Sequence, residues 1–474
     1  MNAPASIVTE ASLLNRQLPL EDIQGLILCD YNLPAVSHFF IRVDQAEGGR
    51  RLVGTLTRNP QSTLRVTTAE DWTQKTPPTS ALNIGFTYAG LQALHLPAVT
   101  LASFAHDKAF VSGAAERAAR IGDSGACAPQ HWRGQLNTKA VHMMVSLYAD
   151  QRSLNSLNAT LKDLVCRHSC TILHCEAGAR LEDESSQGES QLGVLIHFGY
   201  RDGIGQPVIA GAPRPQFAAA TATAVPSGAF LLGYPSQWLG FQYPVPRPLE
   251  FGRNGSFAAF RILEQDVVGF EKYLDAVAAA TTFDKELVAA KFCGRWRNGV
   301  PLVLSPYSPS PQPPLAPDKL NDFDFTQDPQ GMVCPFDSHI RRTNPRGEAV
   351  AGADNDRHPI VRRGMPYGPK YDPRDGKADD IERGLLGLFV CVSLEDQFEF
   401  LMTNWINRGG FRPELPSATQ DLIAGNIVVG EAAFVIPGSS STIAMPRFSR
   451  FVTTKGAAYC FLPSITGLKY IAAL

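Results

Sequence analysis

The sequence lacks both a charge bias and long hydrophobic runs. Its 474 residues hold 43 Lys and Arg against 45 Asp and Glu, a formal net charge of -2, with no long basic run. Such a chain has no bulk attraction to nucleic acid or to an anionic membrane surface. No stretch reaches the roughly 18 apolar residues needed to span a bilayer. We therefore expect neither a nucleic-acid partner nor a membrane span.

The cysteine pattern does not support a disulfide framework. The nine cysteines are odd in number and irregularly spaced, which favours a reducing compartment. The start of the sequence, "MNAPASIVTEASLLNRQLPLEDIQG", has no basic segment followed by an apolar one, and it has no twin arginine. The sequence therefore predicts a cytoplasmic protein.

Length and composition predict two globular domains. A chain of 474 residues is longer than one compact core usually holds, and 44% hydrophobic with 19% charged residues is typical of a globular protein. Residues 210–228 are rich in Pro, Ala, Thr and Gly and mark a connection. We expect an N-terminal domain at residues 1–220 and a C-terminal domain at residues 221–474. The proline-dense residues 304–325 predict an extended surface loop.

Each half contains a buried strand that runs into a helix. Strand-like residues 140–149 precede residues 150–168, where leucines recur at helical spacing, and residues 384–393 precede a similar helix at 394–410. Further strands are expected at residues 37–43, 170–178, 191–198, 255–263 and 457–464. Because strands and helices mix without strict alternation, the sequence predicts an α+β fold with antiparallel sheets.

One segment has the composition of a metal site. "CRHSCTILHC" holds Cys166, His168, Cys170, His174 and Cys175. Its spacing matches neither C-x2-C nor H-x3-H, and it crosses from a helix end into a strand, so its side chains would point in different directions. Cysteine is also among the most often buried residues. We interpret the segment as structural.

Three loops carry polar residues suited to chemistry. "HFGYRDGIGQP" places Asp202 in a glycine-rich turn, where it either bonds its own backbone or faces a ligand. This turn does not match a phosphate-binding loop. "HPIVRRGMPYGP" holds Arg362 and Arg363, of which only one can face a site because side chains alternate along a strand. "VCPFDSHIRRTNPR" holds His339, which taken alone is a packed loop residue, a base or a ligand.

In order, these loops resemble one family. "GYRDG", "CPFDSHIRRTNPR" and "RRGMPYG" are similar to motifs of the larger, long-chain haem-containing dye-decolorising peroxidases. "LEDIQGLIL", "AVPSGAFLLGYPSQW", "GRWRNGVPLVLSP" and "LEDQFEFLMTNWIN" extend the resemblance over nearly the whole chain. It implies two ferredoxin-like α+β domains with antiparallel sheets, as in dye-decolorising peroxidase and chlorite dismutase-like folds. It also implies haem b bound mainly by the C-terminal domain.

The resemblance implies roles for single residues. His339 falls on the proximal iron ligand and Asp202 on the distal aspartate. Arg362 falls on the distal arginine, because it stands two residues before the glycine of the "RxGxPYG" pattern. Gly203 and Arg341 would be further contacts to the cofactor. The haem, one per chain, would be non-covalent, since the sequence contains no C-x-x-C-H.

Some details of the implied site stay open. The second ring nitrogen of His339 needs an acceptor, for which we expect Glu399 or Asn404. Gly387 stands where the family often has a bulky residue, which implies either a roomier pocket or a glycine packed against backbone. Surface aromatic residues would let electrons leave towards bulky dyes, although most aromatic residues are expected in the core. The candidates by residue type are Trp132, Trp238, Trp296, Tyr367 and Trp405.

The implied activity is the reduction of hydrogen peroxide with oxidation of aromatic or dye-like donors, through a ferryl intermediate. Asp202 would move the peroxide proton and Arg362 would stabilise developing negative charge. Because carboxylates have a reference pKa of about 4, an acidic optimum is expected. A haem-handling protein for transport or iron release, and a structural or cargo protein without haem, are the alternatives. The sequence leaves the oligomeric state open, a homo-oligomer included.

Overall fold

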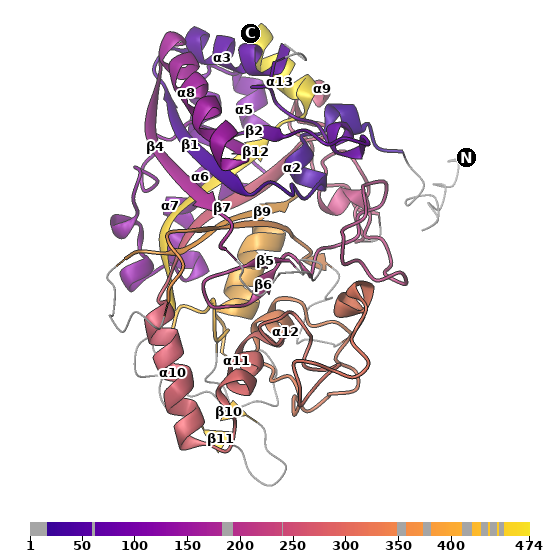
Figure 1. Cartoon of the computed structure of the whole chain (residues 1–474). Helices are drawn as coiled ribbons and strands as arrows, with labels where there is room; N and C mark the ends of the chain where they lie inside the picture. The colour runs from indigo at the N-terminus through magenta and orange to yellow at the C-terminus, as the bar shows by residue number, and fades with distance from the viewer. Residues whose placement is uncertain are drawn as a thin grey trace, which may run out of the picture.

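One eight-stranded sheet forms the centre of the molecule (Figure 1). The computed structural model describes residues 17–58, 62–182, 193–238, 240–347, 357–372, 381–409, 420–427, 435–436, 443–444 and 450–474. In sheet order the strands are β4 (Cys170–Ala179), β1 (Ala35–Val43), β3 (Met143–Ala149), β2 (Ser80–Phe86), β12 (Val452–Leu462), β7 (Ser256–Gln265), β9 (Gly384–Cys391) and β8 (Val361–Tyr367). Each neighbouring pair is antiparallel.

The sheet joins strands from both parts of the chain. Strands β1 to β4 come from residues 35–179, and the other four come from residues 256–462. β12 pairs with β7 along its length but meets β2 only at Phe461 and Phe86. The α+β class with antiparallel pairing is thus confirmed. The division near residue 220 stays a prediction, and it falls between β6 (Arg201–Asp202) and β7.

Two further sheets have two strands each. β5 (Val194–Leu195) pairs with β6 (Arg201–Asp202), and β10 (Val435–Ile436) pairs with β11 (Ile443–Ala444). Of the strand predicted at residues 191–198, residues 191–192 lie outside the described residues, and among residues 193–198 only Val194–Leu195 form a strand. Gly199, with a φ of +85°, turns the chain between β5 and β6, and only glycine adopts this conformation without strain.

Side-chain caps fix where the longer helices begin. Asp150 accepts hydrogen bonds from two backbone N–H groups of α8 (Gln151–Arg167), Asp266 caps α10 (Val267–Ala280) and Asp284 caps α11 (Lys285–Cys293). In Figure 1, α3 (Ala46–Arg58), α8 and α13 (Ile465–Ala473) lie at one end of the molecule, and α10, α11 and α12 (His339–Thr343) lie at the other. The shorter helices are α2 (Gly25–Leu28), α4 (Tyr88–Ala93), α5 (Ala98–Ala102), α6 (Lys108–Ser112), α7 (Ala114–Arg117) and α9 (Leu249–Gly252).

Several single turns are 3-10 helices. They are η1 (Leu20–Asp22), η2 (Glu70–Thr73), η3 (Ala118–Ile121), η4 (Gly125–Cys127), η5 (Pro129–His131), η7 (Ser227–Ala229) and η8 (Pro317–Asn321). η8 lies inside the proline-dense segment that the sequence predicts as an extended surface loop. Leu320 and Phe325 at its end are each 1% exposed and belong to a small hydrophobic core. The segment is therefore partly packed.

The helix predicted at residues 394–410 has π geometry over most of residues 394–406, and Gly410 lies outside the described residues. It forms two segments, η11 (Leu394–Glu399) and η12 (Leu401–Ile406). π-helical turns are rare and frequently lie at functional sites. Phe398, Leu401 and Trp405 from these segments line a cavity of about 1410 Å³.

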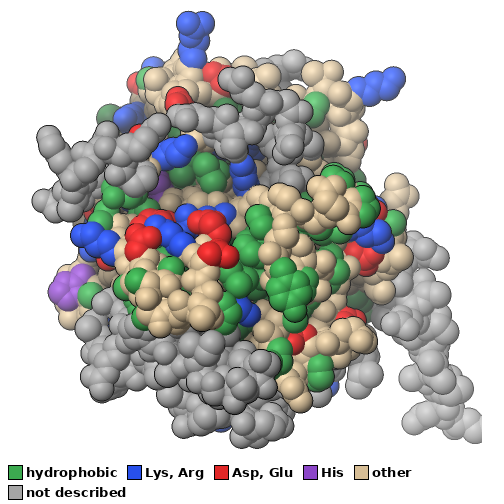
Figure 2. Space-filling model, turned by 60° about the horizontal axis from the view of Figure 1, so that its bottom comes forward, with side chains coloured by type: hydrophobic (Ala, Val, Ile, Leu, Met, Phe, Trp, Pro, Cys, Tyr) green, Lys and Arg blue, Asp and Glu red, His purple; other side chains and the backbone are tan. Residues whose placement is uncertain are grey.

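The surface carries many mixed charges. Figure 2 shows acidic and basic side chains interleaved, on the face towards the end with α10 and α11. There Lys285 pairs with Glu271 and Asp275 at 2.9 and 2.8 Å, and Arg297 pairs with Glu271 at 2.7 Å. Within the described ranges, every helix is too short or too polar to cross a bilayer.

Candidate active site

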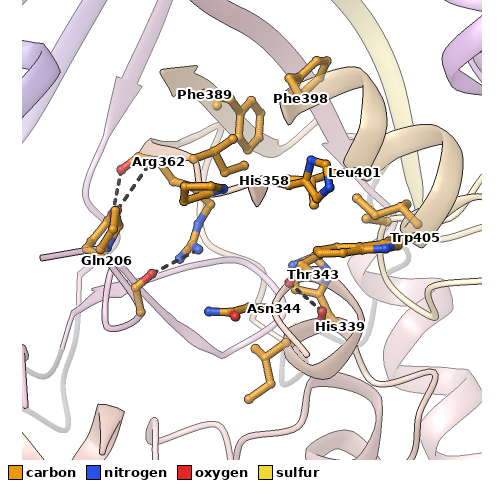
Figure 3. A pocket seen from close by; sticks show the side chains of 18 of the residues that line it. Gln206, His339, Thr343, Asn344, His358, Arg362, Phe389, Phe398, Leu401 and Trp405 are labelled. Carbon is orange, nitrogen blue, oxygen red and sulfur yellow. Dashed lines mark hydrogen bonds between the residues drawn. The ribbon is translucent and has the colours of Figure 1, made fainter. Parts of the chain in front are cut away.

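The three sequence motifs meet at one cavity of about 1410 Å³. Asp202, Gly203, His339 and Arg362 all line it. In Figure 3, Arg362 and Gln206 lie across an open space from His339. Typical ligand pockets measure roughly 300–1,000 Å³. The cavity can therefore hold a large cofactor and leave room for a second molecule.

Asp202 and Arg362 form an ion pair on one side of the cavity. Asp202 ends β6, and Arg362 lies on β8. Arg362 Nη2 is 3.2 Å from Asp202 Oδ1, and Arg362 Nη1 donates to the Gly205 carbonyl at 3.3 Å. Gly203 has a φ of +89°, which turns the chain away directly after Asp202. The pair places a carboxylate beside a permanent positive charge.

The glycine two residues after Arg362 makes room for the carboxylate. Arg362 and Gly364 point to the same face of β8 because side chains alternate along a strand. A Cβ atom at Gly364 would lie 2.8 Å from Asp202 Oδ2. The "RxG" spacing therefore places the arginine and the space for its carboxylate partner side by side. Arg363 also lines the cavity, but its Nε donates to the Leu26 carbonyl at 3.0 Å and not to Asp202.

His339 stands on the other side of the cavity at the start of α12. Its Nδ1–H donates to Asp421 Oδ2 at 2.8 Å. Asp421 is fully buried, and its Oδ1 accepts from the backbone N–H groups of Ile423 and Ala424 at 2.9 and 2.7 Å. Burial disfavours the imidazolium, but the Asp421 carboxylate outweighs burial and raises the pKa of His339. The hydrogen bond to Asp421 fixes the orientation of the imidazole ring. It uses Nδ1, and Nε2 takes no part in it.

The predicted partners of His339 were wrong. Glu399 accepts from Arg117 Nε at 2.9 Å and from the Tyr459 hydroxyl at 3.1 Å. Asn404 donates to the Thr403 hydroxyl at 3.0 Å. Asp421 lies 82 residues after His339, and nothing in the local pattern "TQDLIAGN" marks it.

Arg341 is not brought to the cavity. Its side chain is fully buried, donates from Nη1 to Asp328 Oδ2 at 2.8 Å, and stacks on Phe336 and Phe325 at 4.2 and 4.6 Å. The neighbouring Arg342 pairs with Asp337 at 2.7 Å. Both arginines anchor the loop that carries His339. Arg341 therefore does not lie where the sequence predicts it, in contact with the cofactor.

Two arginines that the sequence reasoning missed do line the cavity. Arg295 donates to the carbonyls of Gly299 and Leu320 at 3.0 and 2.6 Å, and Arg346 donates to the carbonyl and side chain of Asn321 at 2.9 and 2.5 Å. Burial lowers the pKa of Arg346 to about 9, and the charges of Arg295 and Arg362 add to this effect. Burial likewise lowers the pKa of Arg295 to about 10. Clustered cations held by neutral groups form a site for an anion.

The aromatic candidates differ in exposure. Trp132, Trp296, Tyr367 and Trp405 are at most 6% exposed, whereas Trp238 is 39% exposed. Trp405 lines the cavity, and its ring lies 5.4 Å from that of Phe400, which stacks on His358 at 3.5 Å. The Arg357 guanidinium covers Trp238 at 4.6 Å. Most of these aromatics are therefore core residues.

Gly387 lines the cavity, but the space beside it is filled. A Cβ at Gly387 would lie 2.9 Å from the ring of Phe389, the next residue on the same face of β9. The glycine therefore accommodates a neighbouring aromatic ring.

Comparisons with known proteins agree with this architecture. Residues 22–180 match the family model "DyP dimeric alpha+beta barrel domain". The chain is 28% identical to "Peroxidase 2" of Mycetinis scorodonius, covering 95% of this chain and 87% of that protein. It is also 28% identical to a "Dye-decolorizing peroxidase" of Exidia glandulosa, covering 98% and 89%.

Solved structures show the same likeness. A dye-decolorizing peroxidase in complex with 2,6-dimethoxyphenol has a TM-score of 0.79 and 27% identity, covering 96% of this chain and all of that chain. An ancestral D-type dye-decolorizing peroxidase has a TM-score of 0.78 and 26% identity, covering 96% of this chain and 99% of that one. The matched domain, the similarity along the chain and the shared fold together make this chain similar to the dye-decolorising peroxidases, and they support an enzyme of the peroxidase type.

Proposed function

We propose that the chain is a haem b peroxidase in which His339 holds the iron and Asp202 and Arg362 act on hydrogen peroxide at the opposite face. The observation that carries this proposal is one cavity with the His339–Asp421 pair on one side and the Asp202–Arg362 pair on the other. Aromatic and dye-like molecules are the proposed electron donors. Transport of haem or release of its iron would not require the Asp202–Arg362 pair.

The residues at the cavity fit haem. An imidazole whose second nitrogen donates to a carboxylate is a well-oriented and basic iron ligand. Arg295, Arg346 and Arg362 suit the two propionates, because guanidinium groups bind carboxylates in a charge-assisted way. Bound haem would supply the redox chemistry that cleaves the peroxide O–O bond.

Asp202 and Arg362 divide the remaining work. The Asp202 carboxylate can accept a proton from one peroxide oxygen and return it to the other, which then leaves as water. A guanidinium group does not act as a proton acceptor, so the part of Arg362 is electrostatic. It stabilises the negative charge that develops on oxygen, and it needs no reorganisation because Asp202 and Gly205 already orient it.

The test is peroxide-driven oxidation of a phenol and of a dye by the haem-loaded protein. We expect Asp202→Asn and Arg362→Leu each to lower kcat/KM for peroxide by about 10²-fold or more, the range of a lost general base or oxyanion donor. Both variants should keep their Soret band, and His339→Ala should lose its normal iron coordination. Undiminished turnover in the double variant would overturn the proposal.

A further inference from the structure

Gln206 bonds both backbone groups of Arg362. Its Nε2 donates to the Arg362 carbonyl at 2.7 Å, and its Oε1 accepts from the Arg362 N–H at 3.2 Å. Gln206 is 8% exposed and lies four residues after Asp202, on the same loop. Figure 3 shows the two bonds between Gln206 and Arg362.

The position of β8 explains why this contact matters. Among the described residues, β8 is the outermost of the eight strands in sheet order and forms a ladder with β9 alone. An edge strand presents N–H and C=O groups that no further strand satisfies. The Gln206 carboxamide offers one acceptor and one donor to the same residue, as a neighbouring strand would. It therefore holds the backbone of β8 at the residue that carries the guanidinium.

Three residues of one loop act on the same arginine. Asp202 and Gly205 bind the Arg362 guanidinium, and Gln206 binds its backbone. We propose that Gln206 is a positioning residue that sets the distance between Arg362 and Asp202. This inference rests on the proposed function, because it assigns Gln206 a role in the peroxide step.

The geometry leaves little tolerance. The 3.2 Å separation between Arg362 Nη2 and Asp202 Oδ1 is at the long end of the hydrogen-bond range. Loss of the carboxamide frees the Arg362 backbone on its outer side, where water can replace both bonds. A misplacement of about 1 Å in a positioned group can cost about 10²-fold in rate.

Gln24 provides a matched control. Its Oε1 accepts from the N–H of Ile84 on β2 at 2.8 Å, and its Nε2 donates to the Ile84 carbonyl at 2.9 Å. It also donates to the Pro463 carbonyl at 2.8 Å. This is the same two-sided contact to one strand residue, but Gln24 does not line the cavity. If the role of Gln206 were only to seal an edge, both glutamines would behave alike.

The experiment compares Gln206→Met, Gln206→Glu and Gln24→Met in the haem-loaded protein. Met keeps the length of the side chain without its hydrogen bonds, and Glu keeps the acceptor for the Arg362 N–H. We expect Gln206→Met to lower kcat/KM for hydrogen peroxide by about 10- to 100-fold with an unchanged KM for a phenol donor. In Gln206→Glu, kcat/KM for hydrogen peroxide should fall less than in Gln206→Met. Gln24→Met should lower Tm and leave kcat/KM for peroxide unchanged.

A crystal structure of Gln206→Met gives a readout that does not depend on turnover. We expect the Arg362 Nη2 and Asp202 Oδ1 atoms to move beyond hydrogen-bonding distance. An unchanged separation with unchanged kcat/KM would overturn the proposal, as would an equal loss of kcat/KM in Gln24→Met. If Gln206→Met does not fold, Gln206→Glu decides by the same two measurements. If the unaltered protein shows no peroxide turnover, the proposed function fails, and the crystallographic separation alone decides the positioning role.

Discussion

The Asp202 carboxylate lies against Gly364, where any side chain would begin 2.8 Å from its Oδ2 atom. Gly364→Ala therefore should push the carboxylate away from Arg362. Because β8 is an edge strand, the added methyl should change Tm little. We expect kcat/KM for peroxide to fall by about 10-fold or more, as positioned groups are sensitive to shifts below 1 Å. Steady-state kinetics at varied peroxide measures this, and full activity in the alanine variant would contradict the contact.

Asp421 should govern how strongly His339 holds haem. Loss of the hydrogen-bond partner of a metal-bound histidine typically costs about 10- to 100-fold in metal affinity or activity. We expect Asp421→Asn to weaken haem binding by that order, measured by titrating the haem-free protein and following the Soret band. Asn404→Ala is the control, because Asn404 bonds Thr403 and not His339. Equal affinities in the two variants would contradict the assignment.

Arg346 should oppose folding and favour cofactor binding. Its buried charge lies near Arg295 and Arg362, and its pKa is lowered to about 9. We expect Arg346→Met to leave the Tm of the haem-free protein unchanged or raise it, while haem affinity falls by about 10-fold, the loss of one charge-assisted contact. Calorimetry and haem titration measure the two effects. A lowered Tm with unchanged affinity would reverse the interpretation.

Asp107 should make stability depend on pH. It is 3% exposed, and burial raises its pKa to about 7, although hydrogen bonds from Phe110 N and Leu394 N pull the other way. Its unfolded pKa is about 4, so the unfolded chain loses this proton first as pH rises. The group therefore lowers the unfolding free energy between about pH 4 and 7, by up to about 4 kcal/mol.

Asp107→Asn removes this titration while keeping the shape of the side chain. We expect the stability of the unaltered protein to fall more than that of the Asn variant between pH 4.5 and 7 (about the window set by the two pKa values). Denaturant unfolding at several pH values measures the difference. Parallel curves for the two proteins would show that Asp107 does not titrate in this range.

Much of the sheet could be predicted from hydrophobic patterns. The strands predicted at residues 37–43 and 255–263 correspond to β1 (Ala35–Val43) and β7 (Ser256–Gln265). Apolar residues predominate in both strands, and most of each strand is buried. Residues 394–410 show helical spacing of apolar side chains, but their π geometry could not be read from this spacing. A π turn shifts the hydrogen-bond partner by one residue while the same side chains stay buried.

Only those residues of the site that stand in recognisable sequence motifs could be predicted. His339, Asp202 and Arg362 stand in recognisable patterns, and all three line one cavity. Asp421 could not be predicted from the sequence. Its role depends on the hydrogen bond to His339, which is close in space but 82 residues away along the chain. Arg341 and Arg346 stand five residues apart in the same motif, and only Arg346 lines the cavity. Arg341 is held by Asp328 and Arg346 is held by Asn321. The positions of these two partners therefore decide which arginine reaches the cavity.

The order of strands has a consequence for biosynthesis. β12, at residues 452–462, follows every other described strand in the chain, yet it stands between β2 and β7. During translation, β1 to β4 emerge first and keep an open edge at β2, while β7, β8 and β9 form a group without a neighbour on the β7 side. Exposed edges of this kind template aggregation. The two groups of strands can therefore join only after nearly the whole chain has been synthesised. We expect incomplete chains to depend on chaperones and to be susceptible to proteolysis.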